Sequence, residues 1–374
     1  MLTAEISNSW TYRQPVEIHF ESGCLSKLAE AVRKIGGMRG LLVTSHSFQT
    51  LAQDLQHNPE NRIQVIYPSV RPNPELAFVE ACDTLIRTNQ LDFVVALGGG
   101  SVLDCAKAAA AVAAGQYDIR HYFGTENPLP EKGLPVIAIP TTAGTGSEVT
   151  SVSVLSDGTK KVPLSASSLT AKIAWIDPEL TETLSPRLTA ITGMDALCHA
   201  IEAFISVHHQ PICDALAVHA ATLILQHLEQ AVAHGDDKTA RSALAEASVT
   251  AGLAFALPKT TGPHACSYPL TAQYGIPHGE ACALTLDAFL RMDADLPRVQ
   301  ELAKRLEFAD PTALTERIVQ LKQAIHLRTN LKDFSLTEQQ IVQLARDSQH
   351  PNLRNNPKHI TEDMLIAMYT ELAR

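Results

Sequence analysis

The sequence lacks the features of several specialised protein classes. Its seven cysteines are scattered and include no C-x-x-C pair, which argues against a disulfide framework and is typical of reduced thiols in a cytosol. No apolar run reaches the length of a membrane-spanning helix, and the opening stretch MLTAEISNSWTYRQP lacks the basic start and apolar core of a signal peptide. We therefore expect a cytoplasmic protein without a membrane partner.

An excess of positive charge is also missing. Thirty Lys and Arg against forty Asp and Glu leave a formal net charge of −10, which argues against general nucleic-acid binding. The composition, 45% hydrophobic and 19% charged, is typical of a globular protein, and 374 residues suffice for two domains. Internal repeats and low-complexity linkers are absent from the sequence.

The chain changes character near residue 180. Before it, short apolar runs alternate with helical patterns, and we expect strands at 16–20, 41–44, 63–67, 93–97, 136–139 and 173–176. After it, long Ala- and Leu-rich stretches predict helices almost throughout. The predicted architecture is therefore an α/β domain with a largely parallel sheet at 1–182, followed by an all-helical domain at 183–374.

Two turns at strand ends are rich in glycine and hydroxyl groups. VVALGGGSVLDCAKAAA at 94–110 carries three glycines and a serine between a strand and a helix, where free N–H groups can hold a phosphate. IPTTAGTGSEVTS at 139–151 again follows a strand. Each turn alone could be an ordinary tight loop. Together, in one sheet, they favour a nucleotide site.

Four candidate metal ligands lie in the predicted helical domain. Within GMDALCHAIEAF, Asp195 and His199 stand at i and i+4, so they share one helix face. His264 and His278 occur in the similar short sequences Pro-His and Pro-His-Gly. One carboxylate with three imidazoles suits Zn²⁺ or Fe²⁺ and has too much nitrogen for Mg²⁺ or Ca²⁺.

Thiolate ligation is a rival at this site. Cys198 stands at i+3 from Asp195, and Cys266 lies close to His264 in the sequence. We interpret both cysteines as small residues of the core, because free cysteine commonly behaves as a small apolar side chain.

Four separated motifs, GGGSVLDCAK, PTTAGTGSEVT, DPELTETLSPRLTAITGMDALCHAIEAF and IPHGEA, together resemble the iron-containing (group III) alcohol dehydrogenases. The resemblance follows the order of motifs along most of the chain. It implies a dehydroquinate synthase-like fold, with an N-terminal dinucleotide-binding domain and a C-terminal helical metal domain. It also implies that Asp195, His199, His264 and His278 bind one divalent metal, typically iron.

The same resemblance assigns residues to the cofactor NADH or NADPH. The pyrophosphate turn would be formed by Gly99, Gly100, Ser101 and Asp104. The second nucleotide loop would contain Thr141, Thr142, Thr145, Gly146 and Ser147, and Lys161 would lie near the cofactor.

Two departures from the family pattern bear on chemistry. Ser45 stands where many members carry an acid that binds the ribose 2′-hydroxyl, so repulsion of a 2′-phosphate is removed and NADPH becomes allowed. Tyr268 stands where members usually have a histidine near the nicotinamide. With Asp195, Tyr268 is the candidate catalytic residue, although a phenol with a pKa near 10 makes a different proton relay.

These assignments predict a metal-dependent NAD(P)H oxidoreductase that interconverts an aldehyde and a primary alcohol as a homodimer. HACSYPLTAQYGIPHGEACAL most resembles the branch that reduces phosphonoacetaldehyde to 2-hydroxyethylphosphonate, and candidate partners of the phosphonate are Lys259, Arg291, Arg354 and Lys358. A general aliphatic alcohol dehydrogenase or aldehyde reductase is the close alternative. A dehydroquinate-synthase-like lyase and a non-enzymatic metal- or nucleotide-binding protein are the more distant ones.

Overall fold

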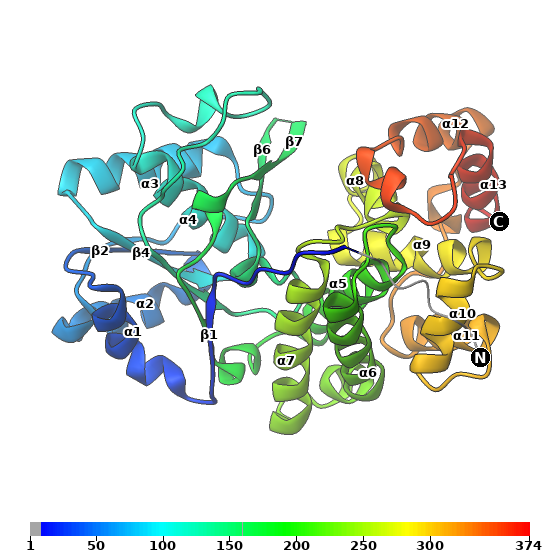
Figure 1. Cartoon of the computed structure of the whole chain (residues 1–374), viewed down its shortest axis with the longest axis horizontal. Helices are drawn as coiled ribbons and strands as arrows, with labels where there is room; N and C mark the ends of the chain where they lie inside the picture. Colours follow the sequence, from blue (N-terminus) through cyan, green and yellow to red (C-terminus); the bar gives the residue numbers. More distant parts are fainter. Residues whose placement is uncertain (1–8, 159) are drawn as a thin grey trace. The chain divides into compact units, whose positions relative to one another are not determined.

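The computed structural model describes residues 9–158 and 160–374, which group into two compact units (Figure 1). One unit is Pro15–Leu184 and the other is Ser185–Arg374 together with residues 9–14. The division falls two residues after the boundary expected from the sequence. Residues 9–14 group with the helical unit, where the side-chain amide of Gln210 donates to the carbonyl oxygen of Thr11 at 3.4 Å.

The first unit is built on a six-stranded parallel sheet in the order β1-β8-β5-β4-β2-β3. Its strands are β1 (Glu17–Phe20), β2 (Gly40–Thr44), β3 (Ile63–Tyr67), β4 (Phe93–Gly98), β5 (Val136–Pro140) and β8 (Ile173–Ile176). The central strands are buried along their whole length, as expected for a sheet covered on both faces. All six predicted strands are present, and the predicted fold class is confirmed.

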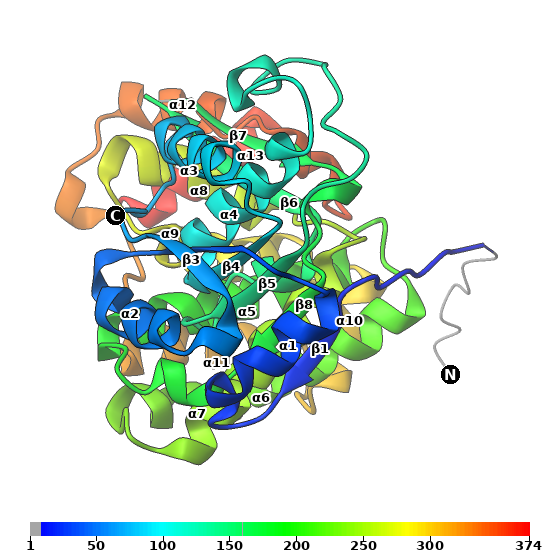
Figure 2. The same ribbon diagram turned by 90° about the vertical axis from the view of Figure 1, so that its left-hand side faces the viewer.

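Helices cover both faces of this sheet (Figure 2). They are α1 (Leu28–Ile35), α2 (Gln49–His57), α3 (Leu76–Asn89) and α4 (Gly100–Ala113). α1 and α2 share a core with β2, β4, β5 and β8, while α3 and α4 pack together on the opposite side.

An antiparallel hairpin of β6 (Val152–Asp157) and β7 (Lys160–Ser165) was not expected from the sequence. The dipeptide Asp157-Gly158 between two short runs that contain Val and Leu is a hairpin signal that the sequence analysis did not use, and Pro163 within the second run argues against a strand there. The hairpin packs on α4 and follows the second glycine-rich turn.

The second unit is helical along nearly its whole length. Its helices are α5 (Pro186–Ile205), α6 (Pro211–Ala233), α7 (Lys238–Phe255), α8 (Gly262–Tyr274), α9 (His278–Met292), α10 (Pro297–Arg305), α11 (Pro311–Ala324), α12 (Glu338–Asp347) and α13 (Glu362–Leu372). α5 packs against α6, α7 and α9, and a second core joins α8 and α9 to α12 and α13.

Two of these helices are long and apolar enough to cross a membrane by length and composition, so the expectation that no apolar run reaches that length is wrong for α5 and α6. Most of the apolar window of α5 is buried inside the protein, which is the property of a core helix. Less than half of the window of α6 is buried, and this helix packs against α5 and α7. Alanine-rich core helices reach this hydropathy because they carry few charges.

Candidate functional site

Three helices bring the four predicted ligands together. Asp195 and His199 lie one turn apart in the buried middle of α5. His264 stands in the first turn of α8, and His278 is the first residue of α9. Asp195, His199 and His264 are buried, whereas the side chain of His278 keeps 32% of its surface exposed. The site is therefore closed on most sides and open at His278.

Gly279 allows α9 to approach α5 closely enough for His278 to reach Asp195. A Cβ atom at Gly279 would lie 2.3 Å from the carbonyl oxygen of Ile191 and 2.8 Å from the Cβ of Asp195. Neither contact is compatible with a larger side chain unless the helices separate. The glycine that follows His278 is thus a packing requirement of the site.

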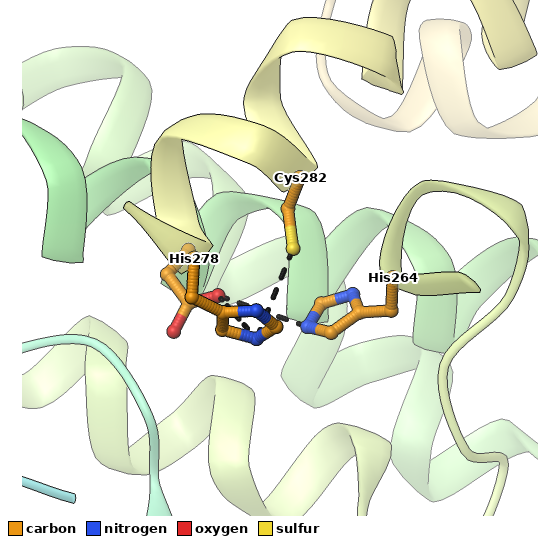
Figure 3. Close-up of side chains that lie close together, drawn as sticks. His264, His278 and Cys282 are labelled. Carbon is orange, nitrogen blue, oxygen red and sulfur yellow. Dashed lines mark hydrogen bonds and ion pairs between the residues drawn. The ribbon is translucent and has the colours of Figure 1, made fainter. Parts of the chain in front are cut away.

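The imidazoles of His264 and His278 point toward one another, with Cys282 beside them (Figure 3). His264 Nε2 lies 3.0 Å from His199 Nε2 and 3.7 Å from Asp195 Oδ1, and His278 Nε2 lies 3.9 Å from the same carboxylate oxygen. Ligands held at ~2.1 Å from one ion stand about 3.0–3.5 Å apart in octahedral or tetrahedral geometry. Asp195, His264 and His278 therefore suit one transition-metal ion, and His199 lies next to this group through its contact with His264.

Hydrogen bonds orient two of the imidazoles. His264 Nδ1 lies 2.5 Å from Glu202 Oε1, and because a carboxylate only accepts, we assign the proton to Nδ1. Ser267 donates its hydroxyl proton to the carbonyl oxygen of His264, so it can only accept from His278 Nδ1, which lies 3.2 Å away. Both rings are thereby set to present the lone pair of Nε2 to the common point.

Sequence reasoning did not assign roles to Glu202, Ser267 and Cys282. Glu202 is fully buried and also accepts from the backbone N–H and the hydroxyl of Thr261, at 2.6 and 3.1 Å. Cys282 lies one turn after His278, and its ligand atom groups with those of Asp195, His264 and His278 within 4.8 Å. The spacing from His278 is the signal that could have drawn attention to Cys282. The cysteines considered earlier, Cys198 and Cys266, are absent from this group, and so is the predicted ligand His199.

Tyr268 flanks the candidate metal site. Its ring centroid lies 6.2 Å from that of His278 and 4.6 Å from that of His350, which precedes the short 3-10 helix Pro351–Asn355. Burial is the main cause that raises the pKa of the Tyr268 phenol well above its usual value. The phenol consequently stays protonated at neutral pH and is a hydrogen-bond donor rather than a base.

In the α/β unit, the two glycine-rich turns pack on one another. A Cβ at Gly100 would lie 2.7 Å from the side chain of Thr145, and one at Gly99 would lie 3.3 Å from that of Thr142. The N–H of Thr141 donates to the carbonyl oxygen of Gly98, at 3.1 Å. The turns form one continuous surface where β4 and β5 end.

Asp104 and Lys107 of α4 fasten the second turn. Asp104 accepts from the hydroxyl of Ser147 at 2.5 Å and from the N–H of Val154 at 2.9 Å. The fully buried Lys107 ammonium donates to the carbonyl oxygens of Ser147 and Val152, at 2.8 and 2.5 Å. Asp104 and Ser147 therefore bind each other and fix the second turn against α4.

The remaining predicted cofactor residues are spread around these turns. Ser101 lies in the first turn of α4, and Gly146 adopts a left-handed conformation with φ 60° just before a 3-10 turn. Ser45 directly follows β2, at the same edge of the sheet as the turn after β4. Lys161 lies on β7, and its ammonium is 3.3 Å from the side-chain oxygen of Asn73.

Comparison with known proteins gives a consistent family. Residues 15–178 match the iron-containing alcohol dehydrogenases, and residues 189–373 match the C-terminal region of the Fe-containing alcohol dehydrogenase family. The solved structure of a sulfoacetaldehyde reductase from Bifidobacterium kashiwanohense in complex with NAD+ is 47% identical, with a TM-score of 0.95, over 98% of this chain and 99% of that chain.

Curated relatives include long-chain-alcohol dehydrogenase 1 of Geobacillus thermodenitrificans, 42% identical over 72% of this chain and 69% of the relative. Another is the 1-propanol dehydrogenase PduQ of Salmonella typhimurium, 34% identical over 89% of this chain and 91% of the relative. These relatives are dehydrogenases, which disfavours the lyase and non-enzymatic alternatives. The chain therefore belongs to the iron-containing alcohol dehydrogenase family and is an NAD-linked, metal-dependent oxidoreductase of alcohols and aldehydes.

Proposed function

We propose that this enzyme reduces a two-carbon aldehyde that carries a tetrahedral oxyanion, phosphonoacetaldehyde or its sulfonate analogue, to the corresponding primary alcohol. The observation that carries the proposal is the 47% identity, over 98% of the chain, to a sulfoacetaldehyde reductase. Phosphonoacetaldehyde and sulfoacetaldehyde share the reacting carbonyl and differ in the acid group. A site that holds one of these groups needs cationic or N–H partners, and such partners also suit the other.

The metal would be held by Asp195, His199, His264 and His278; the short distances of His264 to Asp195 and to His199 support this set. When bound there, a divalent ion supplies Lewis-acid chemistry to the substrate oxygen, while the nicotinamide supplies the hydride. Glu202 and Ser267 hold the imidazoles in the tautomer that this ligation needs. His264→Ala and His278→Ala should each lose metal, measured by mass spectrometry, while the circular dichroism of the fold survives. Stoichiometric metal in both variants would contradict the assignment.

The cofactor would bind along the two glycine-rich turns of the α/β unit. Free N–H groups at the start of α4, near Gly99, Gly100 and Ser101, suit a pyrophosphate. The role of Asp104 and Ser147 would then be to shape the turn, since they bond to one another. Ser45 leaves room for either NADH or NADPH.

Among the four cations proposed for the acid group, two already have carboxylate partners. Arg291 donates to Asp287 at 2.8 Å, and Lys358 donates to Asp295 at 2.8 Å. Lys259 stands five residues before His264, and its ammonium donates to the carbonyl oxygen of Ala256 at 3.3 Å. Partial desolvation lowers its pKa. Neither Lys259 nor Arg354 has a carboxylate partner among the described residues, and Lys259 is our choice for the oxyanion partner because it is much closer in sequence to the ligand His264.

The function is tested with a panel of aldehydes on metal-loaded enzyme with NADH and with NADPH. We expect the highest kcat/KM for phosphonoacetaldehyde or sulfoacetaldehyde. Lys259→Gln should raise KM for these substrates by about 10- to 100-fold, the scale of one lost charge-assisted hydrogen bond, and should leave KM for propanal unchanged. Lys358→Gln is the matched control and should change neither KM.

The second candidate, a general aliphatic alcohol dehydrogenase, is favoured by the relatives that act on long-chain alcohols and 1-propanol. A higher kcat/KM for propanal or a longer aldehyde than for both oxyanion aldehydes would support it and overturn the first proposal.

A further inference from the structure

The cysteine beside the candidate metal site is placed like a ligand. The Sγ atom of Cys282 lies 3.9 Å from Nε2 of His278, and the side chain points from α9 toward the imidazoles (Figure 3). Cys282 is fully buried. Its sulfur, the carboxylate of Asp195 and one nitrogen each of His264 and His278 all lie within 4.8 Å of one another.

The donors come in two matched pairs and one single residue. α5 supplies Asp195 and His199 at i and i+4, and α9 supplies His278 and Cys282 at the same spacing. Residues four apart on a helix face the same way, so the two pairs face each other where the helices pack. His264 of α8 adds the fifth donor.

The distances suit a nitrogen and a sulfur on one ion. Zinc binds imidazole nitrogen at ~2.0–2.1 Å and thiolate sulfur at ~2.3 Å, which places the two ligand atoms about 3.1–3.8 Å apart at the 90–120° angles of a five-coordinate site. The observed 3.9 Å between Cys282 Sγ and His278 Nε2 requires only a small approach. No rotation of α9 is needed, because both side chains already face the common point.

We propose that Cys282 is a thiolate ligand of the same metal, in addition to Asp195 and the three histidines. On ligation the thiol proton passes to solvent and a sulfur–metal bond forms, with no change in oxidation state. A thiolate makes the donor set softer and favours Zn²⁺ relative to a set of nitrogen and oxygen alone. This inference rests on the metal site of the proposed function.

Metal substitution provides a direct test that does not depend on activity. The wild-type enzyme loaded with Co²⁺ should show a thiolate-to-cobalt charge-transfer band in the near ultraviolet. X-ray absorption of the Zn²⁺-loaded enzyme should show one sulfur at ~2.3 Å among the ligands. Cys282→Ser should abolish both signals and lower the Zn²⁺ affinity by about tenfold or more.

Cys266→Ser is the matched control, because Cys266 is equally buried but lies beside the hydroxyls of Tyr369 and Ser348. It should keep both signals. If the wild type binds one Co²⁺ or Zn²⁺ per chain without sulfur among the ligands, the inference about Cys282 is overturned and the four-residue site stands. If the wild type binds neither metal, the site itself is wrong. Should Cys282→Ser fail to fold, the wild-type absorption spectrum alone decides.

Discussion

The carboxylate of Glu202 offers the sharpest test of how the protein prepares the site. It is fully buried and receives three hydrogen bonds, from the N–H of Thr261, the hydroxyl of Thr261 and Nδ1 of His264. Glutamine has nearly the same shape but presents only one oxygen. In Glu202→Gln, if the oxygen keeps both bonds to Thr261, the amide N–H₂ faces His264 and forces Nδ1 to accept.

The proton of His264 must then move to Nε2, which points at Asp195 and His199. A protonated nitrogen cannot bind a metal, so we expect the affinity for Zn²⁺ or Fe²⁺ to fall about 10- to 100-fold, the usual effect of removing a carboxylate behind a ligand histidine. Loss of the charge-assisted bond should also lower the free energy of unfolding of the metal-free protein by roughly 1.5–3 kcal/mol.

The assay is metal retention against graded chelator, combined with urea unfolding with and without metal. Asp293→Asn is the control, because this buried carboxylate in the same unit accepts from the side chain of Asn356 instead. It should leave the metal affinity unchanged. A Glu202→Gln variant that retains metal as tightly as the wild type would refute the reasoning about the tautomer of His264.

Three further predictions concern single side chains. Tyr268→Phe should change turnover little, and Tyr268→Ala should weaken cofactor or substrate binding, because the ring packs beside His350 and His278. If turnover of Tyr268→Phe instead falls by about 10²-fold while metal and cofactor stay bound, Tyr268 is a proton donor. Wild-type enzyme should use NADPH at least as well as NADH, and Ser45→Asp should shift kcat/KM toward NADH; a strong wild-type preference for NADH would contradict this. Burial raises the pKa of Glu148 to about 7 in the folded chain, whereas the carboxyl of the unfolded chain loses its proton above about pH 4.5. The free energy of unfolding therefore falls as the pH rises toward 7. Between pH 5 and 7.5 the loss in free energy of unfolding amounts to roughly 2 kcal/mol, and urea unfolding should detect it in the wild type and not in Glu148→Gln. If the free energy of unfolding depends on pH in the same way in both proteins, Glu148 is not the cause.

The sequence alone was sufficient for the secondary structure of the sheet and for the order of the two units. Six apolar runs became six parallel strands, because continuous Val, Ile and Leu are stable only where both faces are covered. The helical repeat likewise placed Asp195 and His199 on one face of α5 before any tertiary contact was known. The β6–β7 hairpin was missed, because Pro163 argues against a strand and the turn signal Asp157-Gly158 was not used.

Contacts between distant segments were decided only by the tertiary structure. Nothing in the sequence distinguishes Glu202 from other polar residues of a helix. Its role follows from the packing of α8 on α5, which brings Thr261 and His264 into hydrogen-bond contact with it. Cys282 becomes a candidate ligand only because Gly279 lets α9 approach α5. Local spacing determines which side chains share a helix face, because helix geometry is the same everywhere. Which faces then meet depends on the volumes and glycines at each crossing, and that is a property of the packed molecule.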